Sequence, residues 1–216
     1  IFVETYPYGS KTTETSIQNL THEALLHYYQ TQPRTDNAAL FVAGHVDDAD
    51  LRLIEKYIGH WKPERAPLVK PEHTPGPAAE KKQRIPKAKS VQASVVIGKP
   101  MFNKHHPDYG QFIILNTLFG GYFGSRLMSN IREDKGLTYG IHSGLYPLKC
   151  AGYWAIYTDT NNKSLDLCLD EIYREIKRLQ EEPIPEEEIR LARNYVMGRF
   201  LSRADGPFSR METFKS

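Results

Sequence analysis

Hydrophobic and polar positions in the first part of the chain predict two helices separated by a strand. Residues 21–30 predict a helix with Thr21 as its N-cap. Residues 38–43 form a continuous apolar run before Gly44, which predicts a strand buried on both faces. A second helix is expected from Asp47, where acidic residues favour a helix start. Its apolar stripe, with spacings of three and four, consists of Leu51, Ile54, Ile58 and Trp61.

Beyond residue 90 the pattern combines strands and helices. Alternating apolar and polar residues over 91–97 predict a strand. A helix is expected over 108–119, opened by a capping box of Asp108 and Gln111. A glycine-rich turn follows it.

The next segment predicts a short helix and a pair of strands. Ser125 is expected to cap the helix, which ends at Gly136. Strands are expected over 137–146 and 153–158, and the residues between them have the composition of a hairpin connection.

Two further helices complete the pattern. The first has an apolar stripe formed by Leu165, Cys168, Leu169, Ile172, Ile176 and Leu179. The second starts at Pro185, with acidic residues in its first turn. Its expected buried face consists of Ile189, Ala192, Val196 and Phe200. Hairpin strands with helices gathered beside them predict an α+β fold, with an antiparallel-rich sheet and helices on one face.

Prolines divide the chain into two structural units. Residues 63–89 contain Pro63, Pro67, Pro71, Pro75, Pro77 and Pro86. We therefore expect a Pro/Lys-rich linker at 63–89 between units at 1–62 and 90–216. The linker ends in a basic run, Lys81 to Lys89, that has no interleaved aromatic residues for base stacking. A solvated linker is favoured over a nucleic-acid contact.

Composition narrows the functional classes. The chain has 216 residues, 40% hydrophobic and 25% charged, with a net charge of +2. This is typical of a globular domain without a global field for nucleic acid, and no apolar run is long enough to span a membrane. The start shows no signal peptide and no initiator Met, so we interpret the sequence as an excised piece. Cys150 and Cys168 are expected to be two buried free thiols.

No metal-binding motif is visible in the sequence. The chain contains neither a His-x-x-Glu-His motif nor a Cys-x-x-Cys motif. His22 and His27 are five residues apart, which on a helix separates them by roughly 140° and prevents a shared metal. His105 and His106 are interpreted as solvated loop residues. We therefore expect no metal in this chain.

Several segments carry a family resemblance. Residues 118–127 (LFGGYFGSRL) and 131–139 (IREDKGLTY) resemble the C-terminal region of the M16 (insulinase-like) zinc peptidases. Residues 40–48 resemble the apolar strand and Gly-Asp-Val-Asp element of that family, with His45 in place of the usual Asp. Residues 54–63 and 185–193 resemble two of its helices. The resemblance extends over nearly the whole chain.

The resemblance implies a duplicated α+β unit, with two such units facing each other across a closed chamber. The first unit of the family carries an inverted zinc motif, and its glutamate acts as general base. The second supplies an arginine and a tyrosine that hold the substrate backbone. Arg132 and Tyr139 match that pair, and their separation of seven residues also matches. The glycine-rich turn adds Gly120, Gly121 and Gly124 as expected substrate-binding residues.

The resemblance therefore implies a non-catalytic, substrate-binding section of an M16 zinc metallopeptidase. Its expected partners are a peptide substrate and a catalytic M16 domain, in the same chain or in a partner subunit. Zinc is expected in that missing domain and not here, so this chain alone should not hydrolyse peptides. The alternative is a structural or inactive-partner subunit of the same family.

The residues themselves leave another interpretation of the pair open. Tyr139 shares strand parity with Leu137 and Ile141, which is also the pattern of a core tyrosine. Arg132 at the end of a helix also fits a partner for the helix dipole. Guanidinium and phenol are nevertheless both donors suited to a peptide carbonyl.

Overall fold

The computed structural model describes residues 1–2, 4, 6–31, 38–60 and 80–215, which fall into two compact units. One unit comprises the described residues of 1–10 and 73–198. The other comprises the described residues of 11–72 and 199–216. The first unit contains the sheet, the residues matched to the family's arginine–tyrosine pair, and most of the buried core.

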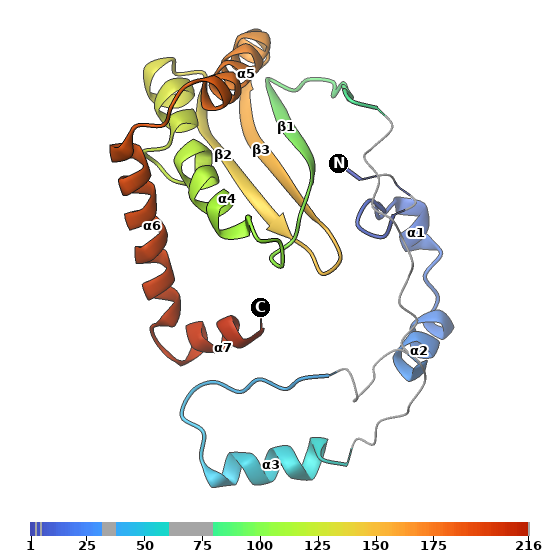
Figure 1. Ribbon diagram of the computed structural model, residues 1–216. Helices are drawn as coiled ribbons and strands as arrows, with labels where there is room; N and C mark the ends of the chain where they lie inside the picture. Colours follow the sequence, from blue (N-terminus) through green and yellow to red (C-terminus); the bar gives the residue numbers. More distant parts are fainter. Residues whose placement is uncertain (3, 5, 32–37, 61–79, 216) are drawn as a thin grey trace. The chain divides into compact units, whose positions relative to one another are not determined.

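A three-stranded antiparallel sheet forms the centre of the first unit (Figure 1). Its strands are β1 (Gln92–Met101), β2 (Thr138–Pro147) and β3 (Gly152–Asn161), in the order β1-β3-β2. Strands β2 and β3 are a hairpin, and β1 pairs with β3 along its full length. The three strands expected from the alternating pattern are thus confirmed.

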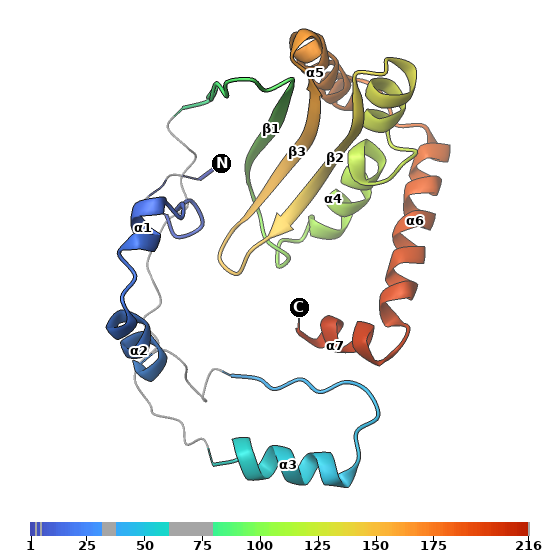
Figure 2. The ribbon, with the colours of Figure 1, turned by 180° about the vertical axis from the view of Figure 1, so that it is seen from behind.

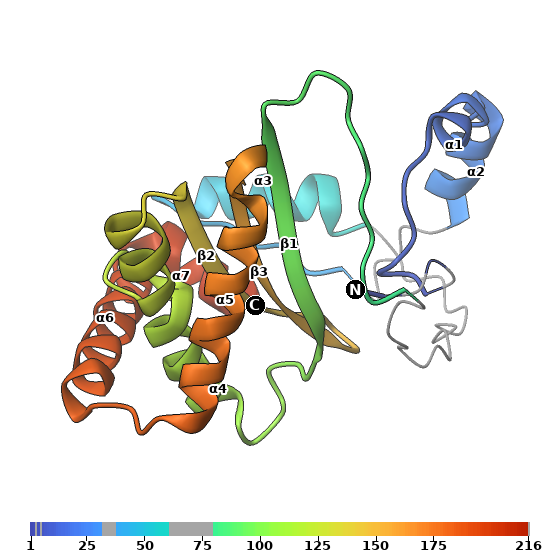
Figure 3. The same ribbon diagram turned by 90° about the horizontal axis from the view of Figure 1, so that it is seen from above.

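Helical segments pack on one face of this sheet, as Figure 3 shows for α4 and α5. They are α4 (Tyr109–Asn116), η2 (Thr117–Gly121), η3 (Met128–Asp134) and α5 (Leu165–Glu181). Seen from behind, the strands lie in front of α4 (Figure 2). The α+β class, with helices on one face of an antiparallel sheet, is confirmed.

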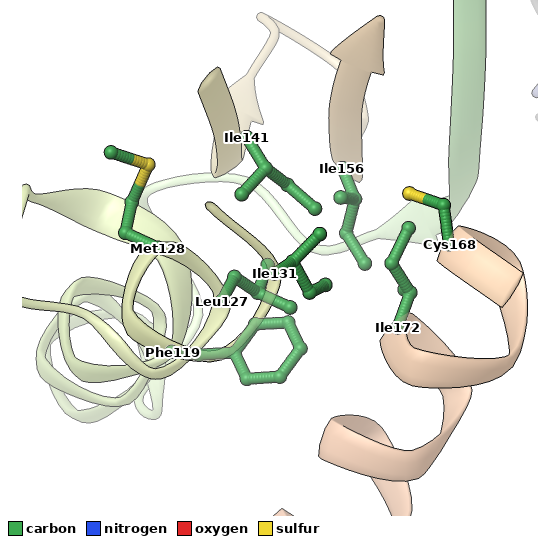
Figure 4. Packing of buried hydrophobic residues seen from close by; sticks show 8 residues of the cluster. All are labelled: Phe119, Leu127, Met128, Ile131, Ile141, Ile156, Cys168 and Ile172. Atoms are coloured by element: carbon green, nitrogen blue, oxygen red, sulfur yellow. The ribbon is translucent and has the colours of Figure 1, made fainter. Parts of the chain in front are cut away.

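The core lies between the sheet and these helices (Figure 4). Strands β2 and β3 contribute Ile141 and Ile156, and α5 contributes Cys168 and Ile172. The segments between α4 and β2 contribute Phe119, Leu127, Met128 and Ile131. The stripe predicted for α5 is therefore the face that closes the core.

One buried side chain ties the helical layer to the sheet. The Oδ1 of Asn116 accepts hydrogen bonds from Ser143 Oγ at 2.8 Å and from Trp154 Nε1 at 2.7 Å. Its amide nitrogen donates to the Ser143 carbonyl at 3.1 Å. A buried polar group is tolerated only when its hydrogen bonds are made, and Asn116 meets this condition through both strands of the hairpin.

The opposite face of the sheet is rich in aromatic rings. Tyr146 stacks on Tyr153 with centroids 4.7 Å apart, and His142 stacks on Tyr157 at 5.2 Å. The pKa of Tyr157 is raised to about 12, mainly by burial and further by a hydrogen bond with Tyr153. These cross-strand pairs stabilise the hairpin from the side away from the helices.

The second unit contains helices α1 (Glu14–Gln18), α2 (His22–Thr31) and α3 (Asp48–Ile58). The predicted N-cap of α2 is present, because the Ala24 amide donates to Thr21 Oγ1 at 3.1 Å. Asp47 caps α3 in a reciprocal capping box with Asp50. Both helix starts predicted here are confirmed.

The buried strand expected at residues 38–43 is not formed. The run is irregular, and Leu40, Phe41 and Val42 are exposed. A strand needs a neighbour to pair with, and no part of the described chain pairs with this run. The predicted stripe of α3 is also open, with Leu51 and Ile58 exposed, whereas Trp61 lies outside the described residues.

Other local expectations are corrected as well. Asp108 precedes α4 but makes no side-chain cap, and the Ser125 hydroxyl has no hydrogen-bond partner in the described structure. Helix α6 (Glu186–Ala204) buries Ala192 but leaves Phe200 exposed. Helix α7 (Pro207–Lys215) was not expected, nor was α1. Cys168 is buried, whereas Cys150 on the β2–β3 connection is exposed.

The linker expected at 63–89 is described only in part. Residues 63–79 lie outside the described residues, and 80–89 contain neither helix nor strand.

Candidate substrate-holding site

Arg132 lies in the last turn of η3, a π-helical segment. Its guanidinium carbon lies 4.9 Å from the ring centre of Phe123, in the geometry of a cation–π contact. Phe123 belongs to the glycine-rich turn and is itself 60% exposed. Arg132 itself is half-buried, and its contact with Phe123 places the guanidinium beside the glycine-rich turn.

Two buried glutamates anchor the segment that carries Arg132. Asn130 donates to Glu175 Oε1 at 2.7 Å and to Glu171 Oε2 at 3.3 Å. Lys135 forms an ion pair with Glu171 at 2.7 Å. The two carboxylates, only 2% and 1% exposed, project from α5. Polar side chains on both ends of η3 thus fix this segment to α5.

The same contacts shift the protonation of Glu171. The hydrogen bond from Lys135 is the largest cause that lowers the pKa of this carboxyl, and Asn130 and Arg174 lower it further. Burial acts in the opposite direction but is outweighed. Glu171 is therefore ionised in the folded chain at neutral pH.

A glycine reverses the chain between the two candidate residues. Gly136 has φ of 61°, in the left-handed region that glycine enters without strain. Its amide donates to the Arg132 carbonyl at 3.1 Å, and the Leu137 amide donates to the Ile131 carbonyl at 2.9 Å. The helix ends with its last carbonyls bonded, and β2 begins immediately, as predicted for Gly136.

Tyr139 is the second residue of β2 and is 90% exposed. Ile141, two residues later, is 2% exposed and belongs to the core. In a regular strand these two side chains would share a face. The register of β2 against β3 is irregular between Thr138 and Ile141, so the alternation is broken at this point. The core-tyrosine interpretation is therefore wrong.

The three expected glycines have different surroundings. Gly120 is buried, and a Cβ there would lie 2.5 Å from Ser143 Oγ and 2.8 Å from Leu127 Cδ1. Gly121 is half-buried and Gly124 is exposed. Gly120 therefore has a packing role. The exposed part of the turn contacts Arg132 through Phe123.

The structure brings only some of the expected site residues into contact. Arg132 meets the glycine turn, but among the described residues no hydrogen bond or ring contact joins Tyr139 to Arg132. The pattern of the sequence did not single out Phe123, Asn130, Glu171 or Glu175. A signal for the glutamates was present, because both fall on the stripe of α5 with Cys168, Ile172 and Ile176.

The described residues do not fit a zinc site. No group of three or more His, Cys, Asp or Glu side chains in that part of the chain is placed to hold a metal ion. Among the described helices, none is both long and apolar enough to cross a bilayer.

The sheet, its helical layer and the glycine-turn segment are those of an M16-type α+β domain. A family model described as the peptidase M16 inactive domain matches residues 19–196. The chain belongs to this family.

Two curated relatives illustrate the match. The uncharacterized zinc protease YmxG of Bacillus subtilis is 27% identical over 202 residues, which cover 92% of this chain and 48% of the relative. The probable mitochondrial-processing peptidase subunit beta of Schizosaccharomyces pombe is 28% identical over 159 residues, covering 68% of this chain and 35% of that protein. This chain thus spans about half of YmxG and a smaller share of the yeast protein.

Solved structures agree on the fold. A protease from Helicobacter pylori superposes with a TM-score of 0.84 at 18% identity, covering 99% of this chain and 52% of that one. A peptidase M16 inactive domain from Pseudomonas fluorescens has a TM-score of 0.75 at 24% identity, covering 93% and 49%.

Proposed function

We propose that this chain is the substrate-holding, non-catalytic section of an M16 zinc peptidase, with Arg132 and Tyr139 as the pair that holds the peptide. The observation that carries the proposal is the 90% exposure of Tyr139. Ile141, two residues later in the same strand, is buried in the core, and strand alternation alone would place both side chains on that face. A tyrosine that served only packing would follow the alternation into the core. A phenol presented to solvent at the start of a strand is available to a ligand.

The chemistry of the pair suits a peptide backbone. A guanidinium and a phenol both donate hydrogen bonds, and a peptide carbonyl accepts two. The cation–π contact with the Phe123 ring attracts the guanidinium through its charge and needs none of its N–H groups as hydrogen-bond donors. Zinc and the general base come from the catalytic domain, on the same chain or on a partner subunit. In this arrangement residues 1–62 close the first M16 unit, 63–89 link the units, and 90–216 form the second.

Peptide binding by the chain tests this proposal. A fluorescein-labelled casein peptide is titrated with the chain, and the affinity is followed by fluorescence anisotropy. Tyr139→Phe should weaken binding by roughly two- to tenfold, because one hydrogen bond is lost. Arg132→Gln should weaken it by roughly tenfold or more, because a charge-assisted bond is lost.

The matched controls are Tyr173→Phe and Arg193→Gln, two exposed residues on α5 and α6. Both should leave the affinity unchanged. If the Tyr139 and Arg132 variants bind as the controls do, the proposed role of the pair is wrong.

A second function is favoured by specific relatives. YmfF of Bacillus subtilis, 24% identical over 91% of this chain, is described as a probable inactive metalloprotease. A chain of Complex III2 from Candida albicans matches with a TM-score of 0.75. The alternative is therefore a structural or inactive-partner subunit. Zinc content and casein cleavage by the full-length gene product separate the two, because only a peptidase shows both.

A further inference from the structure

At the start of the hairpin, between Thr138 and Ile141, strand β2 has one residue more than the segment of β3 with which it pairs. Thr138 lies opposite Thr160, and Ile141 lies opposite Thr158. Three steps along β2 therefore match two steps along β3, and Tyr139 and Gly140 are together opposed by Asp159. This is the definition of a β-bulge, a feature that re-aims side chains and is common beside functional sites.

The bulge decides which way Tyr139 points. If the regular pairing of Ile141 with Thr158 continued without interruption, Tyr139 would oppose Thr160. Thr160 is 1% exposed and lies on the core side of the sheet. Tyr139 would then enter the core, as its parity with Ile141 suggests. The extra residue places Thr138 on the core side instead and leaves Tyr139 outside.

A bulge interrupts the ladder, so its backbone groups need other partners. The Thr158 hydroxyl lies 2.9 Å from the Gly140 carbonyl and 2.9 Å from Thr138 Oγ1. Thr138 Oγ1 accepts from the Gly140 amide at 3.1 Å and can donate to the Asp159 carbonyl at 2.7 Å. Thr138 Oγ1 also lies 2.9 Å from the Gly140 carbonyl. The two hydroxyls have only two protons for these contacts, so with the Thr138 proton donated to the Asp159 carbonyl, the Thr158 proton is the one that remains for the Gly140 carbonyl.

Thr158 is the inner member of this cluster. Its side chain is buried at 6% exposure, so water does not readily replace its hydroxyl. Without it, of the two threonine hydroxyls the Gly140 carbonyl keeps only that of Thr138, whose single proton is shared with the Asp159 carbonyl, and the regular register regains its advantage.

We propose that Thr158 is a positioning residue for Tyr139: its hydroxyl holds the bulge at Tyr139–Gly140 and so keeps the phenol at the surface. The link to peptide binding rests on the proposed function above, whereas the orientation of Tyr139 does not.

Thr160 provides a matched control on the same strand and face. It is also buried, and its hydroxyl donates to the Leu137 carbonyl at 2.7 Å, on the other side of Thr138 from the bulge. Thr160→Val removes a hydroxyl of the same kind without touching the Gly140 carbonyl. Thr158→Ser keeps the hydroxyl and removes only a methyl group.

The test uses the whole chain with 3-fluorotyrosine in place of Tyr139. Fluorine NMR reports the surroundings of this ring, and nitration of Tyr139 read by mass spectrometry reports its access to reagent. Thr158→Val should move or split the fluorine resonance and slow nitration, whereas Thr158→Ser and Thr160→Val should match the parent. An unchanged resonance and nitration rate in Thr158→Val would overturn the inference.

Peptide affinity then separates this inference from the proposed function. With both correct, Thr158→Val weakens casein-peptide binding by roughly two- to tenfold, as Tyr139→Phe does. If the resonance moves but neither variant changes affinity, the positioning stands and the substrate-holding role fails. If Thr158→Val does not fold, Thr138→Val removes the other hydroxyl of the cluster and decides by the same readouts.

Discussion

The side-chain amide of Asn130 donates a 2.7 Å hydrogen bond to Oε1 of Glu175 and so joins the Arg132 segment to α5. Glu175 also accepts from Arg178 at 2.9 Å, but its other carboxylate oxygen is buried without a partner among the described residues. Asn130 is the neutral donor between two buried carboxylates, because it also reaches Glu171. The stability of η3 therefore depends on the side chain at position 130.

Asn130→Asp is expected to destabilise the chain strongly. The substitution keeps the shape, removes the donor and places a third negative charge beside Glu171 and Glu175. Lys135, a contact of Asn130 Oδ1, offsets this charge only in part because it already pairs with Glu171. We expect a loss of about 3 kcal/mol in the free energy of unfolding at neutral pH. Urea denaturation measures it, with Asn194→Asp on the exposed surface of α6 as the control. Equal stability of the two variants would contradict the role given to Asn130.

Acid should destabilise the chain through Glu171. Its pKa is lower in the folded chain than the usual 4.5, so its contribution is complete above that value. The contribution is lost as the pH falls through the lower, folded pKa, where the carboxylate that holds Lys135 becomes protonated. Glu171→Gln should lower stability near neutral pH and flatten the acid limb of the stability curve. Urea unfolding as a function of pH reads out both effects; an acid limb as steep as the parent's would argue against this assignment.

Gly120→Ala is expected to destabilise the chain because its Cβ would collide with Ser143 and Leu127. Overpacking of this kind costs about 1–3 kcal/mol. Gly198→Ala, in the interior of α6 with nothing within 4 Å, should instead stabilise by about 0.5–1 kcal/mol. Opposite shifts in melting temperature are therefore expected from the same chemical change. If Gly120→Ala melts like the parent, the packing account of this glycine is wrong.

Two residues of α5 should separate core from surface contributions. Ile172 is fully buried in the core cluster, whereas Leu167 is largely exposed. Ile172→Ala should lower the free energy of unfolding by about 2–5 kcal/mol, and Leu167→Ala by less than about 1 kcal/mol. Chemical denaturation compares the two directly, and a similar loss in both would place the core elsewhere.

The sequence pattern predicted α2 and α3, whose backbone hydrogen bonds lie within each helix, and those strands whose partners lie within the same unit. Alternation located β1, and the spacing of Cys168 and Ile172 located the buried face of α5, because both elements pack on the same core. The run at 38–43 has an equally strong strand pattern but finds no partner in the described chain. An apolar pattern indicates that a segment is stabilised by burial. Whether it forms a strand depends on a neighbouring strand with which it can pair.

For the candidate site, the sequence proposed residues but did not predict their geometry. Motif resemblance identified Arg132 and Tyr139, and the left-handed glycine between them was expected from its type. The direction of Tyr139 depends on a single inserted residue in the ladder, which alternation cannot reveal. The anchoring of η3 by Glu171 was not predicted, although this residue falls on the stripe of α5, because charged residues on a helix are normally assigned to the surface.

Cys150 is exposed and Cys168 is buried, so thiol labelling of the unmodified chain can report on unfolding. Burial raises the pKa of the Cys168 thiol, and the thiolate is the form that reacts with thiol reagents. A maleimide dye added to the native chain should therefore label Cys150 alone, at the hairpin tip. The second thiol becomes reactive only when the helical layer leaves the sheet, so the rate of double labelling measures opening of the core without any engineered probe.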